Sequence, residues 1–269
     1  MFAVTILGNN SALAMHDRHQ TAQVVMCEEY HFLIDCGEST QSQMQRYKVK
    51  RSKIDHIFIS HLHGDHFFGL PGLLNTFNLS NRREDLHIFG PPRLKEILEL
   101  INEASGASYA YEIKFHELSG AGTILELGPV TVSCFPVSHR IPCWGFRFNL
   151  AGKPSKFRDG QLVRPALPSI SYAYCADTCY EENIIEYIKE ANLIYHESTY
   201  LDDQQEKAKM RFHCTSSQAA MIAVKSKVGR LLLGHYSSKY DDIQPFETEA
   251  RLIFRETEAS REGVTYLIK

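Results

Sequence analysis

The chain has 269 residues, of which 43% are hydrophobic, and a formal net charge of −3 at pH 7. This length and apolar content suffice for one large core or for two fused half-domains. The weak acidic balance does not indicate nucleic-acid binding, so any such surface has to be a local patch. No stretch approaches the ~20 apolar residues that a membrane-spanning helix needs, so we expect no membrane span.

The cysteines and the N-terminus indicate a reducing compartment. Seven cysteines are an odd number, and no pair has the CxxC spacing of a structural zinc site. Most of them stand in apolar contexts, which is typical of small core residues. The segment Met1–Gly8 lacks a basic region, and its apolar run is too short for a signal peptide. We therefore expect a cytoplasmic protein.

Strand and helix signals alternate in the first part of the chain. A helix should follow Pro91 and Pro92, where apolar residues recur at i, i+3, i+4 and i+7. Two further helices are expected at 38–47 and 70–78. Strands are expected at 4–7, 23–26, 31–34, 54–60, 112–115, 130–137 and 144–150.

The second part repeats this alternation, with helices expected at 181–191, 216–227 and 246–256 and strands at 172–176, 193–196, 231–233 and 264–268. Such a mixture indicates an α/β or α+β fold without deciding between them. The least regular segment, 151–169, is rich in Gly and Pro. We interpret 1–269 as one domain with two αβ halves, at about 1–150 and 170–269, joined by 151–169.

The most informative motif is His61-Leu62-His63-Gly64-Asp65-His66, which directly follows the expected strand at 54–60. Imidazole and carboxylate are good ligands for zinc-like cations. His61 and His63 can point the same way and share one ion, while Asp65 and His66 can turn toward a second. The alternative is a polar loop that happens to be rich in histidine. The spacing favours a site for two metal ions.

Three other expected strands end at a residue that can bind metal: His139, Asp177 and His235. Each is weak evidence alone, because a histidine after a strand is often a surface or core residue. Asp177 could also be only the N-cap of the helix expected at 181–191. Together, four strand ends that each carry a ligand-type residue predict a site at one edge of a sheet.

These motifs resemble the metallo-β-lactamase superfamily and, within it, the ribonuclease Z family. The resemblance covers nearly the whole chain. HxHxDH is specific only to the superfamily, whereas the later elements point to ribonuclease Z. The matching segments include 57–66, 69–73, 139–146, 174–178, 196–200, 213–215 and 234–240. The resemblance implies a four-layer αβ/βα metallo-β-lactamase sandwich and a hydrolase that cuts phosphodiesters.

In this interpretation His61, His63 and His139 bind one ion, and Asp65, His66 and His235 bind the other. Asp177 should bridge the two, because a carboxylate has two oxygens whereas an imidazole offers one free lone pair. The expected cofactors are two Zn²⁺ ions, although a His/Asp site also admits Mn²⁺ or iron.

Three residues are candidates for catalysis. Asp65 can take or orient the proton of the attacking water. His213 is the candidate general acid for the ribose 3′-oxygen that leaves, and Glu197 can keep it protonated. The alternatives are that His213 merely precedes a helix that Thr215 caps, and that Glu197 is a carboxylate at a strand end.

The resemblance implies precursor tRNA as the substrate, with removal of its 3′ trailer. Ribonuclease Z proteins often carry a long projecting arm between the third-motif histidine and the Ala-Asp-Thr element. Only 37 residues separate His139 from Asp177, so we expect this arm to be absent or reduced to a stub. An arm-less phosphodiesterase acting on small phosphodiesters or cyclic nucleotides is therefore the alternative. A catalytically inactive binding subunit is a third hypothesis, which the complete ligand set disfavours.

Two further expectations stay open at this point. The basic run 46–53, which contains no acidic residue, is either a nucleic-acid contact or a solvated helix end. The family resemblance implies a homodimer, but a chain without the arm loses the usual reason to form one.

Overall fold

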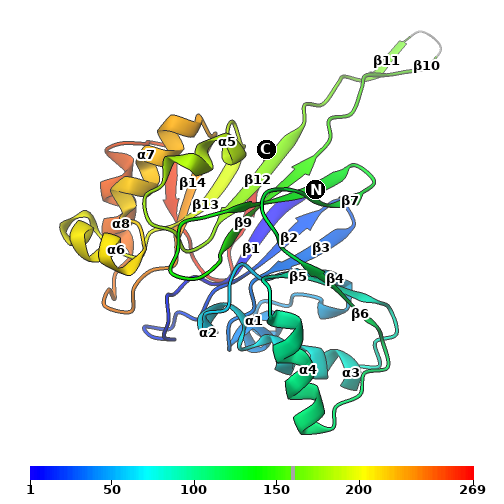
Figure 1. Ribbon diagram of the computed structural model, residues 1–269. Coiled ribbons are helices and arrows are strands. Elements are labelled where there is room, and N and C mark those ends of the chain that lie inside the picture. Colours follow the sequence, from blue (N-terminus) through cyan, green and yellow to red (C-terminus); the bar gives the residue numbers. More distant parts are fainter. Residues whose placement is uncertain (159–160) are drawn as a thin grey trace.

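A computed structural model describes residues 1–158 and 161–269, with side chains for all of these except 157, 158, 161 and 164. Two seven-stranded sheets pack face to face, and helices cover the outer face of each sheet (Figure 1). The layers are therefore helix, sheet, sheet and helix. The predicted four-layer αβ/βα sandwich is confirmed.

The first sheet has the order β16-β1-β2-β3-β4-β5-β6. Strands β3 to β6 are parallel to one another, whereas β1 is antiparallel to both β2 and β16. The carboxyl ends of the parallel strands therefore meet at one edge of the sheet. The strands are β1 Phe2–Gly8, β2 Ala22–Cys27, β3 Tyr30–Ile34, β4 Ile54–Phe58, β5 Leu86–Gly90, β6 Ile113–Glu117 and β16 Thr265–Leu267.

The second sheet has the order β15-β14-β13-β12-β9-β8-β7. Strands β12 to β15 are parallel, and β7, β8 and β9 form an antiparallel meander beside them. The strands are β7 Gly122–Leu127, β8 Val130–Pro136, β9 Trp144–Leu150, β12 Ile170–Cys175, β13 Leu193–Glu197, β14 Leu231–Gly234 and β15 Thr257–Ala259.

The two sheets do not divide the chain where the sequence analysis placed the halves. Strands β7 to β9 lie before segment 151–169 yet belong to the second sheet, and β16 near the end of the chain returns to the first sheet. The chain crosses from one sheet to the other between β6 and β7. Strand patterns alone do not show pairing partners, which is why the irregular segment looked like the junction.

The helices are α1 Thr40–Arg46, α2 Gly64–Phe67, α3 Leu70–Leu79, α4 Leu94–Ser105, α5 Ile185–Ile188, α6 Gln205–Arg211, α7 Ser216–Ser226 and α8 Gln244–Arg251. Short 3₁₀ turns occupy Arg51–Lys53, Glu182–Ile184 and Asp202–Gln204. The helix expected at 181–191 is thus a 3₁₀ turn followed by a single α-turn. Strands β5, β7 and β15 and helix α6 were not predicted, because they are short and their apolar periodicity is weak.

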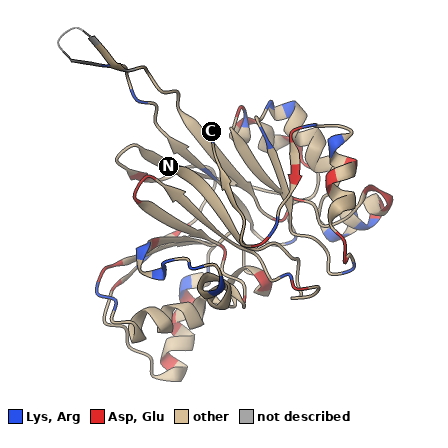
Figure 2. Ribbon diagram, turned by 180° about the vertical axis from the view of Figure 1, so that it is seen from behind, with Lys and Arg blue, Asp and Glu red and all other residues tan. Residues whose placement is uncertain are grey.

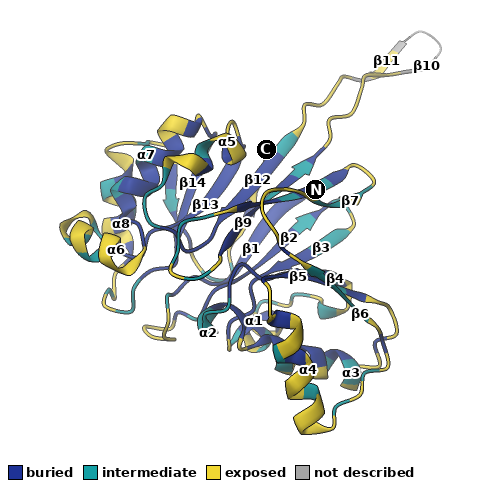
Figure 3. Cartoon of the chain, viewed as in Figure 1, coloured by how far each residue is buried: buried dark blue, intermediate teal, exposed yellow. Residues whose placement is uncertain are grey.

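Three apolar clusters hold the layers together, and the central strands of both sheets are buried (Figure 3). One lies between the sheets and is rich in aromatic residues, such as Phe32, Phe58 and Phe146. A second joins the first sheet to α1, α3 and α4. The third joins the second sheet to α5, α7 and α8. Strands β1, β13 and β14 are buried along their whole length because both faces of each sheet are covered.

The described residues of segment 151–169 project from the sandwich as two short antiparallel strands, β10 Lys156–Arg158 and β11 Gln161–Arg164 (Figure 1). Lys153 and Leu167 pair closer to its base. Strand β10 follows the end of β9, and β11 leads into the start of β12. These two strand ends lie at the edge of the sheet opposite the metal-ligand motifs. The arm is therefore reduced to a stub rather than absent.

The cysteines are all unpaired, and six of the seven are buried. Those expected to be core residues, Cys27, Cys36, Cys134, Cys143 and Cys175, are indeed buried. Among the described residues, no helix is long and apolar enough to cross a membrane.

Candidate active site

Five strands deliver the candidate residues to one edge of the sandwich. The HxHxDH motif follows β4, and His139 follows β8. Asp177 follows β12, Glu197 ends β13, and His235 follows β14. The carboxyl ends of parallel strands meet at the same edge of a sheet, which is where open α/β sheets place their sites. The two facing sheets therefore bring together residues that are up to 174 positions apart in the chain.

The first donor cluster contains His61, His63, His139 and Asp177. Nδ1 of His63 lies 3.0 Å from Nε2 of His61 and 3.1 Å from Nε2 of His139. Oδ2 of Asp177 is 3.7 Å from His61 Nε2 and 3.9 Å from His139 Nε2. A tetrahedral Zn²⁺ with bonds of about 2.0–2.1 Å separates its ligand atoms by roughly 3.4 Å. The donor spacing fits such an ion.

The second donor cluster contains Asp65, His66 and His235, with Asp177 beside them. The Nε2 atoms of His66 and His235 lie 3.3 Å apart. Oδ2 of Asp65 is 3.7 Å from Nε2 of His66 and 3.5 Å from Nε2 of His235. Oδ1 of Asp177 is 3.4 Å and 3.1 Å from the same nitrogens. Asp177 thus presents one oxygen to each cluster, as its expected bridging position requires.

Oδ1 of Asp177 is buried and has no hydrogen-bond partner of acceptable geometry in the described part of the chain. A buried carboxylate oxygen without a partner is costly. A cation shared by this oxygen and the two imidazole nitrogens would satisfy it. This orphaned atom is the observation that best supports metal binding at the paired clusters.

Buried acceptors orient the imidazoles of the HxHxDH motif. Oδ2 of Asp35 lies 2.8 Å from Nδ1 of His66, 2.8 Å from Oγ of Ser60 and 2.7 Å from the Tyr174 hydroxyl. Because a carboxylate only accepts, His66 donates from Nδ1, and Nε2 is the nitrogen left to contact a metal ion. Ser60 donates to Asp35 and can accept from Nδ1 of His61, 3.0 Å away. Both histidines therefore turn Nε2 toward the clusters.

The two later histidines are oriented in the same way. Nδ1 of His139 lies 3.0 Å from the carbonyl oxygen of Phe212, which can only accept. Nδ1 of His235 lies 2.9 Å from Oγ1 of Thr199. Each histidine again donates from Nδ1 and leaves Nε2 free. Such partners behind metal-binding histidines fix the ring and raise its basicity.

The electrostatic environment suits a cation. Burial lowers the pKa of His61, His63 and His139, to about 4 for His63, so these imidazoles are neutral at neutral pH. Burial opposes the charge of Asp65 and Asp177, but the neighbouring imidazoles hold the pKa of both carboxyls below the usual range. These neutral imidazoles and ionised carboxylates are the forms that bind metal. His66 differs: burial opposes its charge, but the carboxylates of Asp177, Asp35 and Asp65 raise its pKa well above the usual range, so a metal ion would replace a proton there.

The backbone is strained where two of these residues stand. Asp35 has φ +55° and His235 has φ +58°, both in the left-handed region that residues with a Cβ rarely adopt. Gly234, just before His235, is required by space, because a Cβ there would lie 2.0 Å from the Tyr195 hydroxyl. The packed surroundings maintain these conformations and fix where the two side chains point.

The buried side chains of His213 and Glu197 form a hydrogen-bonded pair that faces the clusters. Nδ1 of His213 lies 2.8 Å from Oε1 of Glu197. Thr199 donates its backbone N–H and its hydroxyl to Oε2 of the same carboxylate, at 2.9 and 2.8 Å. Burial opposes both charges, yet Glu197 raises the pKa of His213 and His213 lowers that of Glu197. The pair therefore favours a protonated imidazole beside an ionised carboxylate.

Helix capping does not account for the positions of His213 and Asp177. Thr215 does cap α7, in a capping box with Gln218, and His213 just before it still reaches Glu197. Asp177 caps no helix, because the nearest turn begins at Glu182 with Glu181 at its N-cap.

All nine predicted site residues converge at one edge of the sandwich. Sequence reasoning missed the hydroxyl groups behind them, those of Ser60, Tyr174 and Thr199, because nothing in their sequence context marks them.

The basic run lies away from this edge. Segment 46–53 precedes β4, whereas the HxHxDH motif follows it, so the length of the strand separates them. Its Lys and Arg side chains form no ion pair within the described chain and are mostly exposed. Elsewhere Lys and Arg are interspersed with Asp and Glu (Figure 2). A role of this run in nucleic-acid binding stays a prediction.

Known proteins resemble the chain over nearly its whole length. The family model described as Anti-Pycsar protein Apyc1 matches residues 2–259. A ribonuclease Z from Bacteroides thetaiotaomicron is 38% identical over 301 residues, covering 99% of this chain and 95% of that protein. That alignment is longer than the 269 residues of this chain, so the relative has residues that this chain lacks.

Two solved structures share the fold of this chain. Human tRNase Z, short form, has a TM-score of 0.80 and 28% sequence identity, with 99% of both chains covered. The metallo-β-lactamase fold protein YhfI from Bacillus subtilis has a TM-score of 0.78 at 22% identity, with 99% of this chain and 100% of that one covered. The chain therefore belongs to the ribonuclease Z family of metallo-β-lactamase-fold hydrolases and to the family that the Apyc1 model describes.

Proposed function

We propose that the chain is a metal-dependent endoribonuclease that removes 3′ trailers from precursor tRNA. The observation that carries this proposal is the pair of donor clusters joined by Asp177, with the His213–Glu197 pair facing them. The proposal for tRNA draws on the ribonuclease Z relatives and on the similarity to human tRNase Z, short form.

The residues fit two metal ions of the zinc type. His61, His63 and His139 would hold one, Asp65, His66 and His235 the other, and Asp177 both. Imidazole and carboxylate ligands suit Zn²⁺, and they also admit Mn²⁺ or iron. Bound at these positions, the ions would activate water and neutralise the negative charge that gathers on the phosphoryl oxygens.

The side chains supply proton transfer and orientation. Asp65 stands among the second cluster, and its Oδ2 accepts from the backbone N–H of Ala12 at 2.7 Å, which fixes the carboxylate where it can orient the attacking water. His213 holds a proton on the side facing the clusters and gives it to the 3′-oxygen that leaves. Glu197 keeps His213 charged and aligned.

A small phosphodiester is the second candidate substrate, which the stub at 151–169 favours. A long RNA needs contacts beyond the scissile phosphate, and this stub supplies fewer than a long arm would. The metal-binding clusters are the same in either case, so only the substrate distinguishes the two functions.

A paired assay on the metal-loaded protein tests these functions. One substrate is precursor tRNA with a 3′ trailer, the other is bis(p-nitrophenyl) phosphate, and His63→Ala is the control. Cleavage of both by the wild type, lost in the variant, supports the endoribonuclease. Turnover of the small diester alone would assign the protein to the small-substrate class.

The proposal also includes the cellular compartment and the oligomeric state. The six buried unpaired cysteines support a reducing, cytoplasmic compartment. A homodimer, which the family resemblance implies, would be seen as twice the mass of the chain in light scattering.

A further inference from the structure

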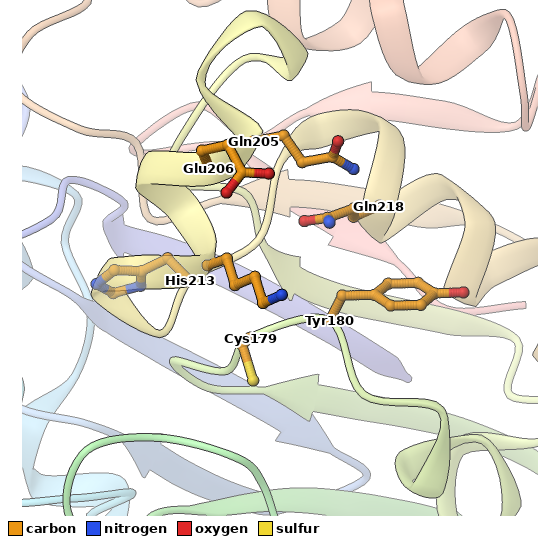
Figure 4. A pocket seen from close by; sticks show the side chains of 7 residues that line it. Cys179, Tyr180, Gln205, Glu206, His213 and Gln218 are labelled. Atoms are coloured by element: carbon orange, nitrogen blue, oxygen red, sulfur yellow. The ribbon is translucent and has the colours of Figure 1, made fainter.

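A cavity of about 440 Å³ adjoins the candidate general acid. His213 forms part of its wall, helix α6 contributes Gln205 and Lys209, α7 contributes Gln218, and Tyr180 comes from the loop after Asp177 (Figure 4). His213 and Tyr180 lie at opposite ends of this view. The cavity is large enough for a nucleotide unit, and none of the roles given above to the site residues uses it.

The orientation of His213 determines which part of a substrate would lie there. Its Nδ1 is held by Glu197, which leaves Nε2 for the substrate, and the ring lies beside Asp177 and His235. In an in-line displacement the leaving oxygen is on the far side of the phosphorus from the attacking water. Since water attacks from the clusters, the leaving 3′-oxygen points toward His213. The imidazole of His213 points away from the other side chains that line the cavity (Figure 4), so the nucleoside reaches the cavity by passing beside this ring.

The cavity wall has the mixed chemistry that a nucleotide needs. Lys209 is exposed and forms no ion pair within the described residues. Glu206 and Gln205 offer an acceptor and an amide, which suit the hydrogen-bonding edge of a base. The ring of Tyr180 supplies a surface on which a base can stack. A site for a simple anion would not include the carboxylate of Glu206.

Lys209 is also placed by the backbone that positions His213. Helix α6 ends at Arg211, and the φ of +59° at its C-cap Phe212 turns the chain. Phe212 N–H donates to the carbonyl of Lys209 at 3.1 Å, and His213 N–H donates to that of Ala208 at 2.9 Å. The backbones of Lys209 and His213 therefore belong to one turn, from which both side chains start.

Resting on the proposed function, we propose that this cavity binds the nucleotide whose 3′-oxygen leaves. Lys209 contacts the 5′-phosphate of that nucleotide, which a long RNA possesses and bis(p-nitrophenyl) phosphate lacks. Gln205 and Glu206 contact its base. The cavity thus distinguishes an RNA chain from a small diester.

The test compares Lys209→Met with Lys207→Met in the metal-loaded full chain. Lys207 is the matched control, because it lies on the same helix but outside the cavity, with its ammonium over the ring of Tyr200. For precursor tRNA, Lys209→Met should lower kcat/KM about 10-fold, mainly by raising KM. The slope of log(kcat/KM) against the logarithm of the salt concentration should become shallower by about 1. Lys207→Met should change kcat/KM less than about two-fold, and neither variant should change turnover of bis(p-nitrophenyl) phosphate.

Equal effects of the two variants on precursor tRNA would overturn the assignment of the cavity while leaving the endoribonuclease intact. A parallel loss on the small diester would also overturn it, because Lys209 would then act through His213. If the wild type does not cut precursor tRNA at all, the proposed function itself fails.

Discussion

Nδ1 of His213 lies 2.8 Å from Oε1 of Glu197, and both side chains are buried beside the two donor clusters. Glu197 accepts three further hydrogen bonds, from the Thr178 backbone and from the backbone and hydroxyl of Thr199. Together with His213, these hydrogen bonds hold both carboxylate oxygens of Glu197 in place. This arrangement makes His213 a proton donor of fixed position rather than a mobile surface histidine.

Replacing His213 by Ala should separate the two substrates. The ribose 3′-oxygen needs a proton to leave, whereas p-nitrophenolate leaves without one. General acid catalysis contributes about 10²- to 10⁴-fold, so kcat on precursor tRNA should fall by that factor. Turnover of bis(p-nitrophenyl) phosphate should change much less. Equal losses on both substrates would show that His213 binds metal or substrate instead. Glu197→Gln should show the same split in weaker form.

Metal content should follow the division into two clusters. His63 belongs to only one of them, so His63→Ala should lower the bound metal from about two ions per chain to about one. Asp177 faces both clusters, so Asp177→Ala should lower it further. Elemental analysis after dialysis measures this directly. If both variants keep the wild-type metal content, the assignment of ligands is wrong.

Asp35 should control metal affinity without touching metal. Its Oδ2 accepts from His66, Ser60 and Tyr174, so Asp35→Asn removes the charge that orients His66. Loss of such a partner typically lowers metal affinity about 10- to 100-fold. Competition with a chelator gives the affinity. Tyr174→Phe, which removes one of the three hydrogen bonds, is the matched control and should have a smaller effect.

His56 should make the fold sensitive to acid. Its ring stacks on His87 at 4.9 Å and lies near Phe32 and Phe89, and burial lowers its pKa to about 4. The unfolded chain binds a proton at about pH 6.5, so the folded state loses relative stability as pH falls from about 6.5 to about 4. At pH 5 this amounts to about 1 kcal/mol, roughly half of the full value for the pKa difference, because solvent screens part of the charge.

The matched variant is His56→Phe, which keeps an aromatic ring in the stack and cannot be protonated. Urea unfolding at pH 7.5 and pH 5.0 measures the free energy of unfolding of both proteins. The loss between the two values should be smaller in the variant by about 1 kcal/mol. An unchanged loss would mean that His56 is not the residue responsible.

The candidate ligands were predictable because each follows an apolar strand and is itself a metal-binding type. His139, Asp177 and His235 needed only the rule that strand ends meet at one edge. Tyr174 and Thr199 could not be found in this way, since a tyrosine within an apolar strand and a threonine in a loop are common. The contact of Tyr174 with Asp35 joins residues 139 positions apart, and only the packing of the two sheets creates it.

The organisation of the fold was predictable in kind but not in detail. Alternating strands and helices indicated the layers, yet the membership of β7 to β9 in the second sheet depends on pairing between strands. Helix α6 was missed because its seven residues, QEKAKMR, carry only two apolar side chains. The cavity beside His213 depends on that helix and could not have been expected.

The most direct test of the central claim is cleavage of precursor tRNA in H₂¹⁸O by the metal-loaded protein, with mass analysis of both products. Water as the nucleophile and the ribose 3′-oxygen as the leaving group predict a 3′-hydroxyl on the tRNA and one ¹⁸O in the 5′-phosphate of the trailer. A 2′,3′-cyclic phosphate on the tRNA, or a trailer without ¹⁸O, would contradict the account, because the nucleophile would then not be water.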